Sequence, residues 1–171
     1  IFEDLLKRWL THIGYDVTHV MNITDVDDKT IAMAKNQNVS LSNITEGYTE
    51  QFMNDLRWLK ILPADNYPRA TKSIYKMIEI IEKLINKGHA YVESDGSVYF
   101  SINTYPDYGK LARVSMKGKT QSNRIKDDEY DKNSPQDFAL WKGWKKEDGE
   151  IGWDAPWGKG RPGWHIECSA M

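Results

Sequence analysis

Hydrophobic residues recur at helical spacing in three stretches of the chain. In the first stretch, residues 1–12, they fall at steps of three, one, three and one from Phe2 to Leu10, and Gly14 follows as a residue suited to end a helix. Similar spacing recurs over residues 40–61 and over residues 70–87. The pattern therefore predicts an amphipathic helix in each stretch.

A segment rich in β-branched and amide side chains, residues 17–24, follows the first of these helices. Its apolar positions do not alternate, which is typical of a short strand buried on both faces. A helix followed by such a strand is half of a βαβ unit. Next come Asp25, Asp27 and Asp28, whose carboxylates suit the start of a helix through residues 29–34. Carboxylates are also magnesium ligands, so this cluster has two interpretations.

The sequence pattern in the second half of the chain predicts short strands and a long polar connector. Asp95-Gly96 is a hairpin-turn dipeptide with apolar residues on both sides, so residues 90–101 are expected to form a β-hairpin. Apolar periodicity nearly vanishes from residue 105 to residue 152, except for a short strand expected at residues 138–141.

Residues 164–168 are also expected to form a strand, reached through a segment rich in Gly, Pro and Trp. Alternation along a strand would place Trp164, Ile166 and Cys168 on one face, and His165 with Glu167 on the other. An aromatic side chain and a thiolate donor would then share a pocket. The alternative is that Cys168 and Trp164 are ordinary core residues.

Composition narrows the class of protein. The 171 residues are 40% hydrophobic and 28% charged with a net charge of -2, as in an ordinary globular domain. This balance gives no sign of a nucleic-acid or membrane partner, and no apolar run approaches the roughly 18 residues of a membrane span. The single cysteine excludes a disulfide within the chain and fits a reducing compartment.

Two local features each allow a functional and a structural interpretation. Residues 109–126 contain six basic side chains and no acidic one, so they could follow an RNA backbone or form a solvated loop balanced by the acidic residues after them. Five tryptophans between residues 141 and 164 could stack on a base or anchor an irregular segment. The basic side chains are Lys110, Arg113, Lys117, Lys119, Arg124 and Lys126.

The tetrapeptide His12-Ile13-Gly14-Tyr15 is close to the His-Ile-Gly-His signature of class I aminoacyl-tRNA synthetases. That signature opens a helix so that its N-terminus meets ATP phosphates. Here His12 closes a helix, so the match is rejected.

Four other blocks, taken together, resemble the cysteinyl-tRNA synthetase family, a class I family. They occur in the family's order and at matching spacing over nearly all 171 residues. The blocks are Asn22 to Lys29, Pro68 to Thr71, Lys87 to Tyr91, and Pro156-Trp157-Gly158 with Gly160 to Met171. The last block is the most specific to the family.

The resemblance implies an α/β fold, part of a Rossmann-like parallel-sheet catalytic domain interrupted by an α+β connective-peptide insertion. Residues 1–88 would belong to the catalytic region, residues 89–152 to the insertion, and residues 153–171 to the returning strand. Both ends of the chain look cut from something longer. The two ATP-binding signatures and three of the four zinc ligands would lie outside residues 1–171, so we expect no cysteine activation by this chain alone.

The resemblance also implies an activity, adenylation of L-cysteine with ATP and Mg²⁺ and transfer to tRNA(Cys) in the cytoplasm, by an enzyme expected to be monomeric and not membrane-bound. Cys168 matches a zinc ligand, Trp164 matches the aromatic residue that closes over the bound cysteine, and Thr24 matches a residue beside that pocket. A zinc-bound thiolate would distinguish cysteine from serine. No residue is expected to act as a nucleophile. The alternatives are a related ligase that joins cysteine to an amino-sugar in mycothiol synthesis, and a noncatalytic RNA-binding module.

Overall fold

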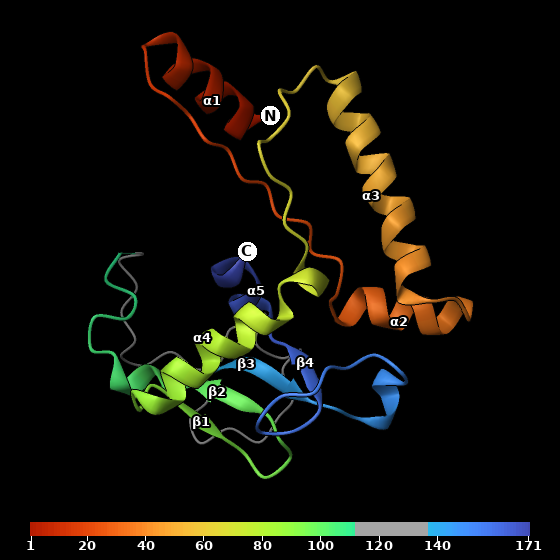
Figure 1. The fold of residues 1–171 in the computed structure, drawn as a ribbon, viewed down its shortest axis with the longest axis vertical. Coiled ribbons are helices and arrows are strands. Elements are labelled where there is room, and N and C mark those ends of the chain that lie inside the picture. Colours follow the sequence, from red (N-terminus) through yellow and green to blue (C-terminus); the bar gives the residue numbers. More distant parts are fainter. Residues whose placement is uncertain (112–136) are drawn as a thin grey trace. The chain divides into compact units, whose positions relative to one another are not determined.

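The computed structural model describes residues 1–111 and 137–171, which form two compact units (Figure 1). Unit 1 comprises residues 1–73 with Met171, and unit 2 comprises residues 74–170. Most of the basic stretch predicted at residues 109–126 lies outside the described residues. None of the described helices has the length and apolar character needed to cross a membrane.

Unit 1 contains the helices α1 (Phe2–His12), α2 (Asp28–Gln37) and α3 (Leu41–Trp58), and ends in the 3₁₀ turn Ala70–Lys72. Each helix was predicted from the sequence. Asp27 caps α2, because its side chain accepts a hydrogen bond from the Thr30 amide at 2.6 Å while Thr30 Oγ1 accepts one from the Asp27 amide at 2.8 Å. The capping interpretation of the aspartate cluster is thus confirmed for Asp27.

Residues 17–24 do not form the strand that the sequence predicts. They run extended and pair in parallel with residues 65–70 through two isolated bridges, Val20 with Asn66 and Ile23 with Arg69. Ile23 is buried but Val20 is half exposed, so the segment is not covered on both faces. The reason is that, among the described residues, a single neighbouring segment supplies its backbone partners.

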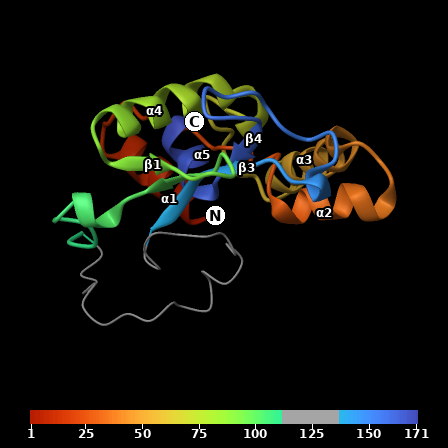
Figure 2. The same cartoon turned by 90° about the horizontal axis from the view of Figure 1, so that it is seen from below.

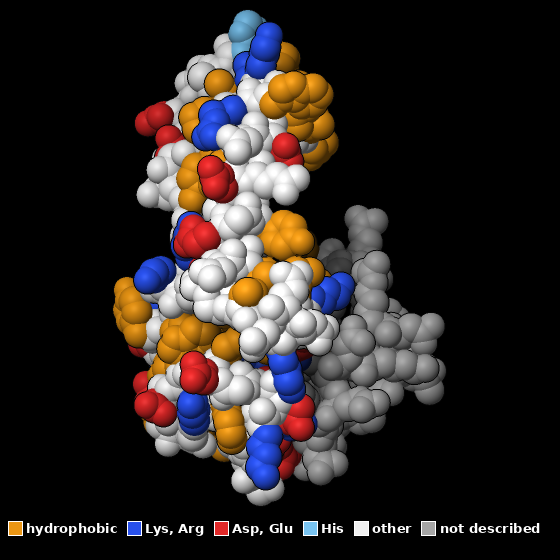
Figure 3. All heavy atoms as spheres, turned by 90° about the vertical axis from the view of Figure 1, so that its right-hand side faces the viewer, with side chains coloured by type: hydrophobic (Ala, Val, Ile, Leu, Met, Phe, Trp, Pro, Cys, Tyr) orange, Lys and Arg blue, Asp and Glu red, His pale blue; other side chains and the backbone are white. Residues whose placement is uncertain are grey.

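The apolar faces of α1 and α3 reach solvent to a degree that their periodicity does not predict. No residue of α1 is buried, and of α3 only Ile44 and Thr45 are. Tyr48, Phe52 and Trp58 of α3 are exposed. Figure 3, viewed from the side of Figure 1 on which α3 is drawn, shows hydrophobic side chains at the surface. Hydrophobic periodicity therefore predicts that these helices form, but it does not predict which residues pack on their apolar faces.

Unit 2 is built on a four-stranded antiparallel sheet in the order β1-β2-β3-β4 (Figure 1), which Figure 2 shows from another side. The strands are β1 (Ala90–Val92), β2 (Val98–Phe100), β3 (Phe138–Gly143) and β4 (Gly160–Pro162), and the helices are α4 (Ile74–Asn86) and α5 (Trp164–Ala170). The predicted helix over residues 70–87, the hairpin over residues 90–101 and the strand at residues 138–141 are confirmed. Short 3₁₀ turns occupy Ile102–Thr104 and Lys146–Asp148.

The core of unit 2 lies between the sheet and α4. Met77 and Ile81 of α4 have no exposed surface, and the same holds for Val98, Tyr99 and Trp141 of the central strands. Trp141 contacts Trp157 edge to face at 5.8 Å, so these two tryptophans anchor the irregular segment between β3 and β4. The structural interpretation of the tryptophan cluster is confirmed for this pair.

The predicted strand at residues 164–168 is wrong, because these residues open helix α5. Strand β4 ends at Pro162, and the Ile166 amide already donates to the Gly163 carbonyl at 3.3 Å. The helix spans Trp164–Ala170, which contains one β-branched residue and two residues, Glu167 and Ala170, of types depleted in strands. In the helix, Ile166 and Glu167 are buried while Trp164 and Cys168 are exposed.

The mixed α/β class expected from the sequence is confirmed. Parallel pairing is present only as the two isolated bridges of unit 1, within the part of the chain that the structure describes. The regular sheet is antiparallel, with β1, β2 and β3 inside residues 89–152, the expected insertion, and β4 in the segment after it. The domain boundaries expected at residues 88 and 152 stay predictions.

Candidate functional site

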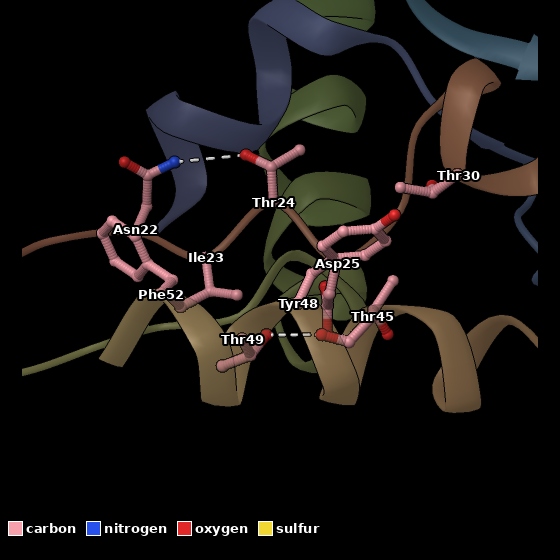
Figure 4. A pocket seen from close by; sticks show the side chains of 9 residues that line it. All are labelled: Asn22, Ile23, Thr24, Asp25, Thr30, Thr45, Tyr48, Thr49 and Phe52. Carbon is pink, nitrogen blue, oxygen red and sulfur yellow. Dashed lines mark hydrogen bonds between the residues drawn. The ribbon is translucent and has the colours of Figure 1, made fainter. Parts of the chain in front are cut away.

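The pocket that holds Thr24 lies in unit 1 and has a volume of about 290 Å³. Figure 4 shows that its walls come from the extended segment at residues 22–25, the start of α2, and one face of α3. The lining residues are Asn22, Ile23, Thr24, Asp25, Thr30, Thr45, Tyr48, Thr49 and Phe52. The accessible surface of the pocket is mostly apolar, although five of the nine lining residues carry a hydroxyl group.

Hydrogen bonds on both sides of Thr24 fix its position. The Ile23 amide donates to the Pro68 carbonyl at 2.8 Å, and the Ile23 carbonyl accepts from the Ala70 amide at 3.1 Å. On the other side, the buried Asp25 carboxylate accepts two hydrogen bonds from Thr71, one from its amide at 2.8 Å and one from its hydroxyl at 2.6 Å. Thr24 itself is exposed, and these hydrogen bonds of its two neighbours position it at the pocket.

The wall supplied by α3 was not identified as a site from the sequence. The stripe through Ile44, Tyr48 and Phe52 predicts a core-facing helix, yet Tyr48 and Phe52 line the pocket and are exposed. The hydroxyls of Thr45 and Thr49 donate to backbone carbonyls within α3, at 3.0 and 2.7 Å. The sequence signal that could have identified this wall is the recurrence at a spacing of four of threonine, at Thr45 and Thr49, and of aromatic residues, at Tyr48 and Phe52.

An ion pair joins the start of α3 to the segment behind the pocket. Arg69 donates two hydrogen bonds to the Glu46 carboxylate, at 2.5 and 3.1 Å. These bonds raise the pKa of the Arg69 guanidinium and lower the pKa of the Glu46 carboxyl. Because both groups stay charged near neutral pH, the ion pair between Arg69 and Glu46 of α3 persists at that pH.

Trp164 and Cys168 lie together on one face of α5 in unit 2, one helical turn apart. Trp164 is 76% exposed and Cys168 is exposed, so neither is a core residue. The buried residues of this helix, Ile166 and Glu167, hold it against the unit. The structure thus brings these two predicted site residues together and places the third, Thr24, in unit 1.

The donor set for a metal is incomplete in the described residues, which contain no group of three or more His, Cys, Asp or Glu side chains able to hold an ion. For the aspartate cluster the contacts favour the structural interpretation over the magnesium one, since Asp27 caps a helix and Asp25 binds Thr71. An exposed thiol on a helix does fit one ligand of a zinc ion. The remaining ligands would have to come from elsewhere.

His12 is the last residue of α1, and Gly14 follows with a φ of +96°. The amide of Tyr15 donates to the Leu10 carbonyl at 3.0 Å, which closes the helix. A signature that binds phosphate must open a helix, so the rejection of His12 to Tyr15 as such a signature is confirmed.

Comparison with known proteins identifies the same family that the sequence motifs resemble. The family described as tRNA synthetases class I (C) catalytic domain matches residues 1–171. A cysteine–tRNA ligase of Chlamydia pneumoniae is 55% identical over the whole chain, and ligases of the same name from Chlamydia caviae and Brachyspira hyodysenteriae are 54% and 53% identical. The chain spans 36% of the length of each of these relatives.

Proposed function

This chain belongs to the class I (C) tRNA synthetase catalytic domain family, and on that basis we propose that its protein is a cysteine–tRNA ligase. The reaction is the ATP-dependent adenylation of L-cysteine followed by transfer of the cysteinyl group to tRNA(Cys). The observation that carries the proposal is identity of 51–55% over the full chain to ligases of that one name. The related amino-sugar ligase has no such support among these relatives.

The exposed pair on α5 forms the amino-acid end of the proposed site. Trp164 stands one turn before Cys168 on the same face, so its ring can cover a ligand held near the Cys168 sulfur. Cys168 would supply one thiolate to a zinc ion, with the other ligands contributed from outside the described residues. When bound, zinc would favour a substrate thiolate over a hydroxyl, because zinc prefers sulfur to a neutral oxygen ligand.

Thr24 would bind substrate, since it lines the pocket of unit 1 and is exposed there. None of these three residues needs to be a nucleophile. Catalysis would rest on positioning and on electrostatic stabilisation of the phosphorus centre. ATP with Mg²⁺ and tRNA(Cys) complete the proposed reaction, in a monomeric cytoplasmic enzyme.

The first test is zinc content and cysteine activation in the full-length enzyme that contains this chain. Cys168→Ser should lower zinc stoichiometry and reduce ATP–pyrophosphate exchange with cysteine, because a neutral hydroxyl is a poor zinc ligand. A double variant, Cys168→Ser with Ser169→Cys, keeps one thiol but moves it about 100° around the helix, so it should not restore zinc. Full zinc content in Cys168→Ser would remove Cys168 from the site.

A second test separates the aromatic role of Trp164 from packing. Trp164→Ala should raise the KM for cysteine more than the KM for ATP, because the exposed ring is proposed to cover the amino acid. Equal changes in both constants would contradict this role. The 171-residue chain alone should show no ATP–pyrophosphate exchange above a catalyst-free blank.

A further inference from the structure

A buried ion pair in unit 2 joins Asp148 to Arg161, neither of which lines the pocket. The Arg161 Nε donates to the Asp148 carboxylate at 3.1 Å, and the two side chains are only 10% and 8% exposed. Charged side chains are rarely buried to this degree, because each one loses its hydration. Apolar residues of similar volume often stabilise such a site as well or better, so the pair suggests a role in fixing geometry.

The Asp148 carboxylate is held in place by its own turn. Its second oxygen accepts a hydrogen bond from the Lys145 amide at 2.8 Å, and the Asp148 amide donates to the Lys145 carbonyl at 2.9 Å. These two bonds close the 3₁₀ turn Lys146–Asp148, which follows β3. The carboxylate is therefore a fixed point on the segment that joins β3 to β4.

The ion pair reaches the middle of strand β4. This strand is three residues long, Gly160–Pro162, and its last residue has no amide hydrogen to donate. Arg161 is the central residue, and its register partner on β3 is Lys142, which is also buried. Like charges directly opposite each other destabilise a sheet, so the Asp148 carboxylate stabilises the pairing of β4 with β3.

Strand β4 leads directly into α5, which begins at Trp164, three positions after Arg161. The connecting residue, Gly163, donates its amide to the Leu140 carbonyl of β3 at 2.9 Å, so no free loop separates the strand from the helix. Helix α5 also packs against β3 and α4. A shift of β4 relative to β3 would therefore be transmitted to the first turn of α5.

We propose that Asp148 and Arg161 are positioning residues for the cysteine site, because their ion pair holds β4 and thereby fixes the start of α5. This inference rests on the proposed function. Neither side chain needs to touch a substrate, since the effect passes through β4 to Trp164 and Cys168. A displacement of about 1 Å in a positioning element can lower a rate about 100-fold, so even a small shift of α5 should be measurable.

The kinetic test uses ATP–pyrophosphate exchange by the full-length enzyme. Asp148→Asn and Arg161→Gln should each lower kcat/KM for cysteine at least about tenfold and leave the KM for ATP within about twofold of the wild-type value. The double variant should be no more impaired than the more impaired single variant, because both changes break one interaction. Arg161→Lys keeps the charge and should retain more activity than Arg161→Gln. The matched control is Glu147→Gln, which removes an exposed carboxylate of the same turn and should change neither constant.

Amide hydrogen exchange, followed by mass spectrometry of the full-length protein, separates local positioning from a general loss of stability. Asp148→Asn should speed hydrogen exchange at least about fivefold in residues 160–170 and leave residues 74–86 of α4 unchanged. Equal acceleration in α4, or a wild-type kcat/KM for cysteine in Asp148→Asn, would overturn the proposal. A wild-type enzyme without cysteine-dependent pyrophosphate exchange would count against the ligase function, whereas the difference in hydrogen exchange would still support the anchoring of α5 by the ion pair.

Discussion

Replacement of Gly163 by alanine tests how closely α5 must sit against the sheet. Gly163 joins β4 to α5, and its amide donates to the Leu140 carbonyl of β3 at 2.9 Å. A Cβ added at this position would overlap the carbonyl oxygen of Ala139 and lie 2.7 Å from its carbonyl carbon. Only glycine allows the chain to pass this close to β3 and then begin the helix.

The size of the effect follows from that overlap. Non-bonded carbon atoms prefer a separation of about 3.5–4.0 Å, so the two backbones would have to move apart by roughly 1 Å. Since both atoms in conflict belong to backbone, rotamer changes cannot relieve the conflict. Overpacking of this kind costs about 1–3 kcal/mol. The displacement would also shift Trp164 and Cys168, so under the proposed function the KM for cysteine of the full-length enzyme should rise.

Urea unfolding followed by tryptophan fluorescence measures this cost, because five of the seven tryptophans lie in residues 141–164 of unit 2. The matched control is Gly47→Ala in α3, where an added Cβ meets no atom within 4 Å. Alanine there should stabilise the helix by about 0.5–1 kcal/mol, followed by circular dichroism. Wild-type stability, together with a wild-type KM for cysteine in the full-length enzyme, would refute the close-approach argument for Gly163→Ala.

Three further predictions concern stability. Asp27→Ala should destabilise unit 1 by about 1 kcal/mol in urea unfolding followed by circular dichroism, because it removes the α2 cap. Asp27→Ser should retain most of the stability that the cap provides, because serine also caps helices. The Asp65 carboxylate accepts a hydrogen bond from the His19 amide at 2.7 Å, which lowers its pKa, so its stabilising effect is present above about pH 4 and is lost as the pH falls through the folded-state pKa. The stability difference between wild type and Asp65→Ala should therefore shrink on acidification from pH 7 to pH 3; a constant difference would contradict this assignment. Met77→Ala should destabilise unit 2 by about 2–5 kcal/mol in fluorescence-detected unfolding, because Met77 is fully buried, while Met77→Leu should cost less than about 1.5 kcal/mol.

The helices α2, α3 and α4 and the β1–β2 hairpin could be predicted because the signals that form them are local. A cap residue, a stripe of apolar positions or an Asp-Gly turn acts within a few residues of itself. The hairpin turn shows this directly, since Gly96 has a φ of +81° and Asp95 accepts a hydrogen bond from the Ser97 amide at 2.8 Å. Such features need no knowledge of distant partners.

The pocket and the pairing of β2 with β3 could not be predicted, since both depend on contacts between distant segments. Tyr48 and Phe52 read as core positions in the sequence, and only the placement of residues 22–25 beside α3 reveals them as a pocket wall. Likewise, Phe100 and Phe138 are 38 positions apart and become neighbours through strand register. Periodicity reports which face of an element is apolar and does not report which surface that face meets.

The shared face of Trp164 and Cys168 was predicted correctly from a wrong secondary structure, and the spacing explains why. A separation of four residues returns a side chain to the same face of a strand and to within about 40° on a helix. Ile166, two residues from each, distinguishes the two, because a strand would place it with them and a helix turns it about 160° away. The structure buries Ile166 and exposes the pair. Trp164 and Cys168 would therefore share a face in either secondary structure. Only the helix, however, buries Ile166 on the opposite side, where it holds the pair against unit 2.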